Sequence, residues 1–281
     1  MRKKEPRRFT FEKVQSKSRW KGFVLGFVAF VLVFGIAAGA YLYTRTDLLG
    51  SDQLMGLFEK QTDDADALHG SGKSATILLM SISSAETLET EKKEIYFLVL
   101  ARADTKEGQI RFCPLPVKDS YLDCYEAGGE PEIVAALEKE YKIKIDRYVS
   151  SNENTFALAI NYLGGLQYTV PQNVTYRTKD LTLIITSGYQ TIKGETLLKY
   201  LKYYKETDLP MQGELFCKMI ENFLTKDNLE NAMPLYKGLM QNMADTTDIS
   251  YVDTADNLND LRVIAENLGN NAVTVASVEA L

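Results

Sequence analysis

The chain of 281 residues contains very little histidine and cysteine, and each shortage removes a class of function. Its one histidine, His69, gives little support to catalysis by a histidine base or to a histidine-ligated metal. Three cysteines, Cys113, Cys124 and Cys217, are too few for a disulfide framework and lack the paired spacing of a zinc site. We therefore expect three buried thiols, with one disulfide and a spare thiol as the alternative.

Charge is distributed unevenly along the chain. Residues 1–21 carry nine Lys or Arg and two Glu, a formal charge of +7 within a chain total of −6. The remainder holds 23 cations and 36 acidic residues, or about −13. Because phosphate binding needs an excess of Lys and Arg, so acidic a region is not expected to bind nucleic acid. The basic head is instead placed to contact the inner leaflet of a membrane.

Residues 22–44 form a run of 23 uncharged residues, which predicts a transmembrane helix. At about 1.5 Å per residue this run is long enough to cross a hydrocarbon core of roughly 30 Å. Nine cations precede it and only Arg45 follows closely, so residues 1–21 should be cytoplasmic and the rest exported. We predict a single-pass protein of the cell membrane with an extracytoplasmic domain. Cleavage at Ala38-Gly39-Ala40, as in a secretory signal, is the alternative.

Beyond the membrane, the pattern predicts a connector over 45–74, one α/β domain over 75–266 and a C-terminal tail over 267–281. Short apolar runs predict buried strands, at 75–82, 94–102, 109–113, 145–150, 166–170 and 181–185. Apolar residues at helical spacing predict helices, at 130–141, 153–163, 194–205, 214–224 and 229–243. Because helices alternate with buried strands, we expect a three-layer α/β/α domain with a central mixed sheet.

Three segments between Ile77 and Ala265 carry a recognisable pattern. Residues 187–204 read SGYQTIKGETLLKYLKYY, similar to Gly-x-Gln-x-Leu-x-Gly followed by a helix that ends Tyr-x-Arg-x-Arg. Residues 104–119 resemble a hairpin that ends in Ile-Pro-Arg-Asp, and residues 132–170 match in the order of their elements. Together with the predicted anchor, these segments resemble the LytR-CpsA-Psr family. The resemblance implies a membrane-anchored phosphotransferase fold that moves glycopolymers from polyprenyl-pyrophosphate carriers onto peptidoglycan in Gram-positive envelopes.

Several charged positions of that family differ in this chain. The resemblance implies acidic ligands for a divalent metal near Ser83 and Tyr96, and neither residue is a carboxylate. It implies Arg-Asp where Val117-Lys118 stand, and two pyrophosphate-binding arginines where Lys202 and Tyr204 stand.

The loop that reads Gly-Asp-x-Gly-Arg-x-x-Arg in the family keeps only Asp208, and Glu214 stands at an arginine position. Arg offers phosphate a bidentate fork, whereas Lys is a point charge and Tyr is neutral. Each lost donor should cost roughly 2 to 4 kcal/mol of transition-state stabilisation. We therefore expect a degenerate relative without transferase activity. Under the alternative of an active enzyme, Mg²⁺ would be the expected cofactor.

The candidate ligand-binding residues are of two kinds. Lys118, Lys202 and Asp208 are what remains of the polar site, and no catalytic residue or metal ligand is assigned. An apolar slot for an isoprenoid tail would be lined by Leu197, Leu201, Leu215, Phe216, Met219 and Phe223. Ordinary core packing is the alternative interpretation of these apolar residues.

Three functions follow from this reading. The leading hypothesis is a pseudoenzyme that binds polyprenyl-linked glycopolymer or partner proteins during cell-wall polymer assembly. One alternative is an active phosphotransferase with a site rebuilt around Lys118, Lys202 and Asp208. The other is an extracytoplasmic scaffold that binds no lipid.

Overall fold

The computed structural model describes residues 74–84, 93–179, 181–225, 228–229, 258–270 and 272–281. The predicted head, the predicted span over 22–44, the connector before Ser74 and almost all of the helix predicted over 229–243 lie outside these ranges. Within them, no helix combines the length and the apolar character needed to cross a membrane.

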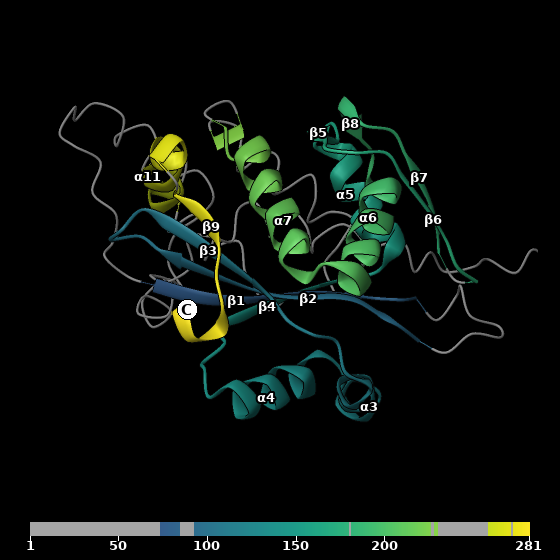
Figure 1. The fold of residues 1–281 in the computed structure, drawn as a ribbon. Coiled ribbons are helices and arrows are strands. Elements are labelled where there is room, and N and C mark those ends of the chain that lie inside the picture. The colour runs from purple at the N-terminus through teal and green to yellow at the C-terminus, as the bar shows by residue number, and fades with distance from the viewer. Residues whose placement is uncertain (1–73, 85–92, 180, 226–227, 230–257, 271) are drawn as a thin grey trace, which may run out of the picture.

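A five-stranded mixed sheet forms the centre of the molecule (Figure 1). Its strands are β1 (Ser74–Ile82), β2 (Ile95–Asp104), β3 (Gln109–Pro114), β4 (Arg147–Ser151) and β9 (Val273–Val275). The spatial order is β4-β1-β2-β3-β9. Strand β2 is antiparallel to β1 and β3, whereas β4 is parallel to β1 and β9 is parallel to β3. Four of the six predicted strands correspond to β1, β2, β3 and β4 of this sheet.

The sheet is buried on both faces, which explains why its strands read as continuous apolar runs. Along β1, Ile77 and Leu79 belong to one hydrophobic cluster, and Leu78 and Met80 belong to the other. Helices cover each face (Figure 1). One layer contains α3 (Asp119–Gly128) and α4 (Glu130–Tyr141), and the other contains α5 (Glu153–Tyr162), α6 (Gly194–Thr207), α7 (Leu209–Phe223) and α11 (Leu258–Asn267). The predicted mixed α/β architecture is confirmed.

Helix α3 was not expected from the sequence. Only Tyr121 and Leu122 are buried in it, so the apolar stripe that announces a helix is short. Helix α4 follows after Gly129, which has a φ of 78°, and has Pro131 in its first turn. Both helices pack below the sheet against the hydrophobic cluster that contains Leu78 and Met80.

The opposite layer depends on a close approach of two helices at Gly194. A Cβ atom there would lie 2.4 Å from the Cα and the carbonyl oxygen of Ala157, so α6 can begin against α5 only with glycine. Two ribbons flank α6: β5 (Leu166–Val170) pairs with β8 (Gly188–Ile192), and β6 (Val174–Arg177) pairs with β7 (Thr182–Ile185). The expected strands correspond to β5 and β7, and their partners β6 and β8 were not expected.

The sheet extends past residue 266, the end of the predicted domain. Strand β9 pairs with β3 from Ile110 to Phe112, and it contacts α7. Past β9, Val278 and Leu281 pack against the cluster below the sheet. The region predicted as a tail therefore completes one edge of the central sheet. It was not predicted as a strand because β9 has only three residues, too few to show an alternating pattern.

Candidate functional site

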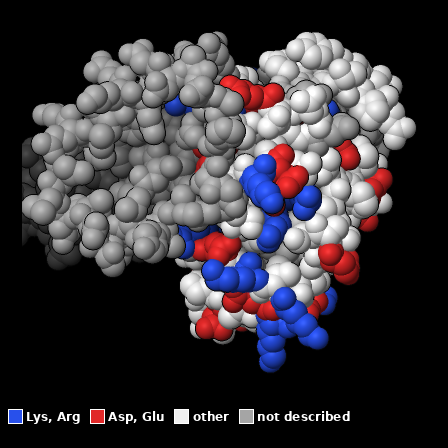
Figure 2. Space-filling model, turned by 90° about the vertical axis from the view of Figure 1, so that its left-hand side faces the viewer, with Lys and Arg blue, Asp and Glu red and all other residues white. Residues whose placement is uncertain are grey.

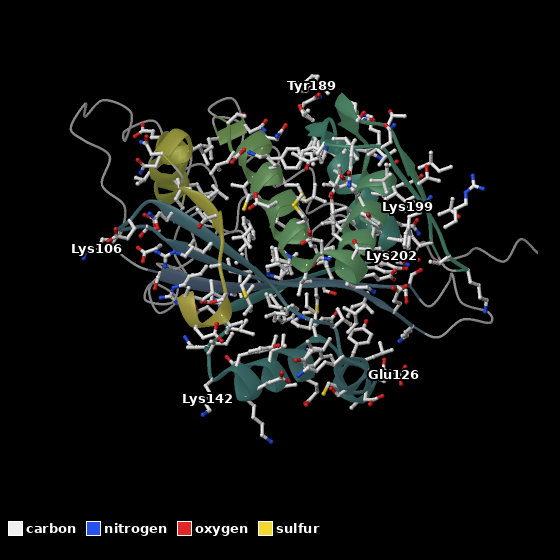
Figure 3. All side chains as sticks on the ribbon, viewed as in Figure 1. Lys106, Glu126, Lys142, Tyr189, Lys199 and Lys202 are labelled. Atoms are coloured by element: carbon white, nitrogen blue, oxygen red, sulfur yellow. The ribbon has the colours of Figure 1, made fainter. Side chains whose placement is uncertain are left out.

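A pocket of about 900 Å³ opens where four connections meet at one end of the domain. These are the approach to β2, the β3–α3 connection, the β6–β7 turn and the α6–α7 junction. The lining residues are Lys93, Glu94, Ile95, Pro116, Val117, Lys118, Asp119, Leu122, Thr178, Lys179, Leu181, Lys202, Lys205, Glu206 and Leu209. Lys202 marks this part of the molecule in Figure 3.

Five lysines and three carboxylates line the pocket, and this excess of cations is the reverse of the balance in the chain as a whole. The lysines come from separate places in the sequence, at Lys93, Lys118, Lys179, Lys202 and Lys205. On a different face of the molecule, positive and negative side chains lie next to one another (Figure 2). A concave surface with an excess of one sign of charge attracts counter-ions, so the pocket is suited to an anion.

Glu94 lies between two of these lysines and binds both. One carboxylate oxygen accepts from Lys202 Nζ at 2.7 Å, and the other accepts from Lys205 Nζ at 2.7 Å. Lys205 also donates to the carbonyl oxygen of Ile95 at 3.1 Å, and Lys202 Nζ lies 4.6 Å from the centre of the Tyr96 ring. The two lysine side chains are only 12% and 13% exposed, so these contacts replace most of their hydration.

The backbone and the ionisation of Glu94 are both fixed by its neighbours. Its N–H donates to Ser83 Oγ at 2.8 Å, and its carbonyl oxygen accepts from the Ser83 N–H at 2.8 Å. Burial alone would raise the pKa of Glu94, but hydrogen bonds from Lys202 and Lys205, together with their charges, outweigh burial and lower it. Glu94 is therefore a carboxylate at neutral pH.

Lys118 is held in a second, more exposed ion pair. Its Nζ contacts Glu140 on α4, and the Tyr121 hydroxyl donates to the other Glu140 oxygen at 2.8 Å. The hydrogen bond to Glu140 raises the pKa of Lys118, and the same bond lowers the pKa of Glu140. Since the Lys118 side chain is 48% exposed, this pair joins α3 to α4 at the rim of the pocket without enclosing the cation.

The structure brings two of the predicted polar residues together and separates the third. Lys118 and Lys202 both line the pocket. Asp208 is instead the N-cap of α7, where its carboxylate accepts from the Met211 N–H at 3.3 Å, and it does not appear in the pocket lining. A capping carboxylate satisfies helix N–H groups, so Asp208 has a structural reason to be present.

The second α6 lysine that lines the pocket is Lys205, one residue after the position that the family pattern indicated. Tyr204 is buried above the sheet, and its hydroxyl lies 2.8 Å from the Tyr200 hydroxyl. Lys205 is three residues after Lys202 and therefore projects from the same side of the helix. Similarly, Glu94 provides an acidic side chain two residues before Tyr96. Glu214, which stands at an arginine position of the family pattern, is exposed and is not in the pocket lining.

The residues proposed to line an apolar slot are core residues in the structure. Leu197, Leu201, Leu215 and Met219 are fully buried, as are Phe216 and Phe223. Phe216 packs against Phe97 and Phe112, with ring centres 5.1 and 5.8 Å apart. None of the six lines the pocket. The apolar part of the pocket comes from other residues, which are Ile95, Pro116, Val117, Leu122, Leu181 and Leu209.

The three cysteines are free thiols, but the burial expected for all three holds for only two of them. Cys113 and Cys217 are buried, and Cys124 is partly buried. Burial, with the charge of Glu279, raises the pKa of Cys113 to about 11, and burial, with the charges of Glu214 and Glu221, raises the pKa of Cys217 to about 12. A thiol with so high a pKa is a poor nucleophile, so neither is suited to covalent catalysis.

A divalent metal such as Mg²⁺ does not fit the part of the site that the structure describes. Mg²⁺ binds through oxygen ligands, mainly carboxylates. Among the described residues there is no group of three His, Cys, Asp or Glu side chains that could hold a metal. Both oxygens of Glu94, one of the carboxylates that line the pocket, already accept hydrogen bonds from lysines.

Comparison with known proteins places this geometry in context. A sequence model described as the LytR_cpsA_psr family matches residues 48–280. The polyisoprenyl-teichoic acid–peptidoglycan teichoic acid transferase TagT of Bacillus subtilis is 21% identical over 251 residues, which cover 83% of this chain and 78% of TagT. The crystal structure of B. subtilis TagV superposes with a TM-score of 0.55 at 18% identity, covering 73% of this chain and 84% of TagV. A structure of the Streptococcus agalactiae protein gbs0355 gives a TM-score of 0.54 at 16% identity, covering 73% and 77%.

Proposed function

The chain belongs to the LytR-CpsA-Psr family, and from that premise we propose that it acts in cell-wall polymer assembly as an extracytoplasmic protein that binds polyprenyl-linked glycopolymer. The relative TagT is named for transfer of teichoic acid from a polyisoprenyl carrier to peptidoglycan. In this chain the proposed role is to bind the pyrophosphate-bearing end of such a carrier without transferring the polymer.

The lysine-lined pocket is the observation that carries this proposal. A pyrophosphate group presents several anionic oxygens, and lysine side chains bind phosphate as point charges. The volume of about 900 Å³ is that of a site for a sizeable ligand. Apolar side chains such as Leu122, Leu181 and Leu209 line the same pocket and offer contact to the first isoprene units beyond the phosphates.

The same geometry favours binding over transfer. Catalysis of phosphoryl transfer rests on preorganised cations that absorb charge in the transition state. Here Lys202 and Lys205 are shared with Glu94, Lys118 is shared with Glu140, and the described residues do not fit a metal. Each of these cations therefore has part of its charge compensated before a ligand enters.

Binding is tested with the full-length chain in detergent and a fluorescent polyprenyl pyrophosphate. We expect saturable binding that weakens roughly tenfold when Lys202 and Lys205 are both changed to Ala, because two charge-assisted contacts are lost. Lys199→Ala is the matched control, because Lys199 is exposed on the same helix and does not line the pocket. Equal affinity in all three proteins, or no binding in any of them, would contradict the proposal.

An active transferase is the second candidate, because Lys202 and Lys205 lie close enough for one group to contact both. If the lysines replace the family's arginines in function, the full-length chain with Mg²⁺ should release polyprenyl phosphate from a pyrophosphate-linked glycan donor. Turnover that disappears in Lys202→Ala, and persists in Lys199→Ala, would support transfer. We expect no turnover above that of a reaction without protein.

Membrane anchoring with an exported domain remains a proposal that rests on residues 22–44 and on the basic head. A reporter enzyme that is active only outside the cytoplasm, fused after residue 281, should be active. The full-length chain should also fractionate with membranes. Soluble protein that begins near Tyr41 would instead indicate cleavage after Ala38-Gly39-Ala40.

A further inference from the structure

The position of Glu94 between Lys202 and Lys205 bears on what kind of anion the pocket accepts. We propose that Glu94 is an internal counter-anion, which occupies the place of a ligand's anionic group and must be displaced before that group can bind both lysines. Glu94 would then determine the affinity of the pocket and its preference for multiply charged anions. The inference rests on the proposed function, since it takes the pocket to be an anion site.

The contacts of Glu94 are those that a phosphate group would make. Each of its two oxygens lies 2.7 Å from a different lysine Nζ. Both lysines are nearly enclosed, whereas 34% of the Glu94 side chain is exposed. The carboxylate is therefore more accessible to an anion from solvent than are the two ammonium groups that it contacts.

Displacement of this carboxylate does not require the main chain to move. Two hydrogen bonds with Ser83 hold the Glu94 backbone at the start of β2. Lys205 keeps its bond to the Ile95 carbonyl oxygen, and Lys202 keeps its position over the Tyr96 ring. Rotation of the Glu94 side chain is therefore enough to free both ammonium groups while they stay in place.

Charge selectivity follows from the balance of the three groups. Glu94, Lys202 and Lys205 together carry a net charge of +1. A singly charged anion that replaces the carboxylate gains almost nothing, because one unit of negative charge is exchanged for another. Pyrophosphate carries several negative charges and makes contacts on more than one side, so its gain exceeds the loss of the carboxylate contacts. The pocket should therefore discriminate strongly between pyrophosphate and a monoanion.

The test is calorimetric titration of the full-length chain in detergent with inorganic pyrophosphate and, separately, with acetate. We expect Glu94→Gln to bind pyrophosphate at least about fivefold more tightly than the wild type, and to gain measurable acetate binding. Glu206→Gln is the matched control: it removes a carboxylate from the same pocket, and this carboxylate accepts a hydrogen bond from the Tyr176 hydroxyl at 2.8 Å. Its affinity should change less than twofold.

Several results would overturn the inference. Weaker pyrophosphate binding in Glu94→Gln would mean that Glu94 positions the lysines for the ligand and does not compete with it. Equal effects of Glu94→Gln and Glu206→Gln would mean that only the net charge of the pocket matters. If Glu94→Gln does not fold, Glu94→Asp is used, because its shorter side chain keeps the charge but cannot reach both lysines. It should bind pyrophosphate about twofold more tightly than the wild type, and unchanged affinity counts against the inference.

Failure of the inference is distinguishable from failure of the proposed function. If polyprenyl pyrophosphate binding depends on Lys202 and Lys205 but is not improved by Glu94→Gln, the function stands and the role of Glu94 is wrong. If neither the wild type nor Glu94→Gln binds pyrophosphate or the polyprenyl ligand, both are wrong.

Discussion

Helix α6 has two faces that obey different requirements. Leu197 and Leu201 are fully buried in the core above the sheet, whereas Lys202 and Lys205 reach into the pocket. The apolar face is set by helical periodicity within a few residues of sequence. The lysine face is instead defined by its contacts with Glu94, which is 108 residues from Lys202 and 111 residues from Lys205. Core positions can therefore be inferred locally, while the chemistry of the pocket depends on distant partners.

Removing a core side chain should produce the largest effect on this comparison. Leu201→Ala deletes a fully buried side chain, which typically costs about 2 to 5 kcal/mol of stability. We expect the midpoint of thermal unfolding to fall on the order of 10 °C, with pyrophosphate affinity changed less than about twofold. A normal unfolding midpoint combined with lost polyprenyl binding would instead support the apolar slot and would remove the distinction between the two faces.

Removing the lysine face should act on binding more than on stability. In the double variant Lys202→Ala and Lys205→Ala, we expect affinity for inorganic pyrophosphate to fall roughly tenfold or more. Glu94 loses both partners but is partly exposed and can be hydrated, so the unfolding midpoint should fall by only a few degrees. Calorimetry and thermal unfolding on the same samples check both expectations. A fall in stability as large as that of Leu201→Ala would mean that the lysines are structural.

Acidification should weaken the ion pairs of Glu94 with Lys202 and Lys205, and should leave the packing of the apolar face unchanged. The lowered pKa of Glu94 means that its ion pairs contribute stability above the ordinary carboxyl pKa of 4.5. That contribution is lost as the pH falls through the lower pKa of the folded state. We expect the difference in unfolding midpoint between the wild type and Glu94→Gln to be constant from pH 7 to about pH 5 and to shrink below pH 4.5. A difference that is independent of pH down to pH 3 would contradict this assignment.

The rim should contribute least. Lys118 is about half exposed and already paired with Glu140, so Lys118→Ala should weaken pyrophosphate binding only about twofold. The effect should decrease in high salt, because an exposed charge is screened. Titration at two salt concentrations checks this, with Lys199→Ala as the control for a lysine outside the pocket. A tenfold loss would place Lys118 alongside Lys202 in importance.

The sequence predicted the elements that bury a regular apolar pattern. Strands β1 to β4 and helices α4 to α7 correspond to predicted segments, because each has a buried stripe or a continuous apolar run. Helix α3 has a short buried face, and β9 has only three residues, so neither gives such a pattern. Strands β6 and β8 are short and each buries only one residue, so their apolar pattern is also weak.

The pocket was predicted in part, for a related reason. Lys118 and Lys202 were identified through the family pattern, and both line the pocket. Lys93 and Lys179 lie in connections where a lysine has no special pattern, so only the folded structure shows that they face the same space. Two signals were available for the others: Lys205 follows Lys202 at helical spacing, and Glu94 immediately precedes a strand whose start lies near an expected ligand position.

The pairing of β9 with β3 has a consequence for how the protein is made. The edge of β3 from Ile110 to Phe112 can be covered only after residues 273–275 have been synthesised, about 160 residues later. Until then, the growing chain exposes the unpaired edge of β3, and an unpaired strand edge is a site for mispairing between molecules. Helix α7 also contacts β9, so its final docking waits for the same segment. Much of the domain must therefore be kept from aggregation as an incomplete sheet during biosynthesis.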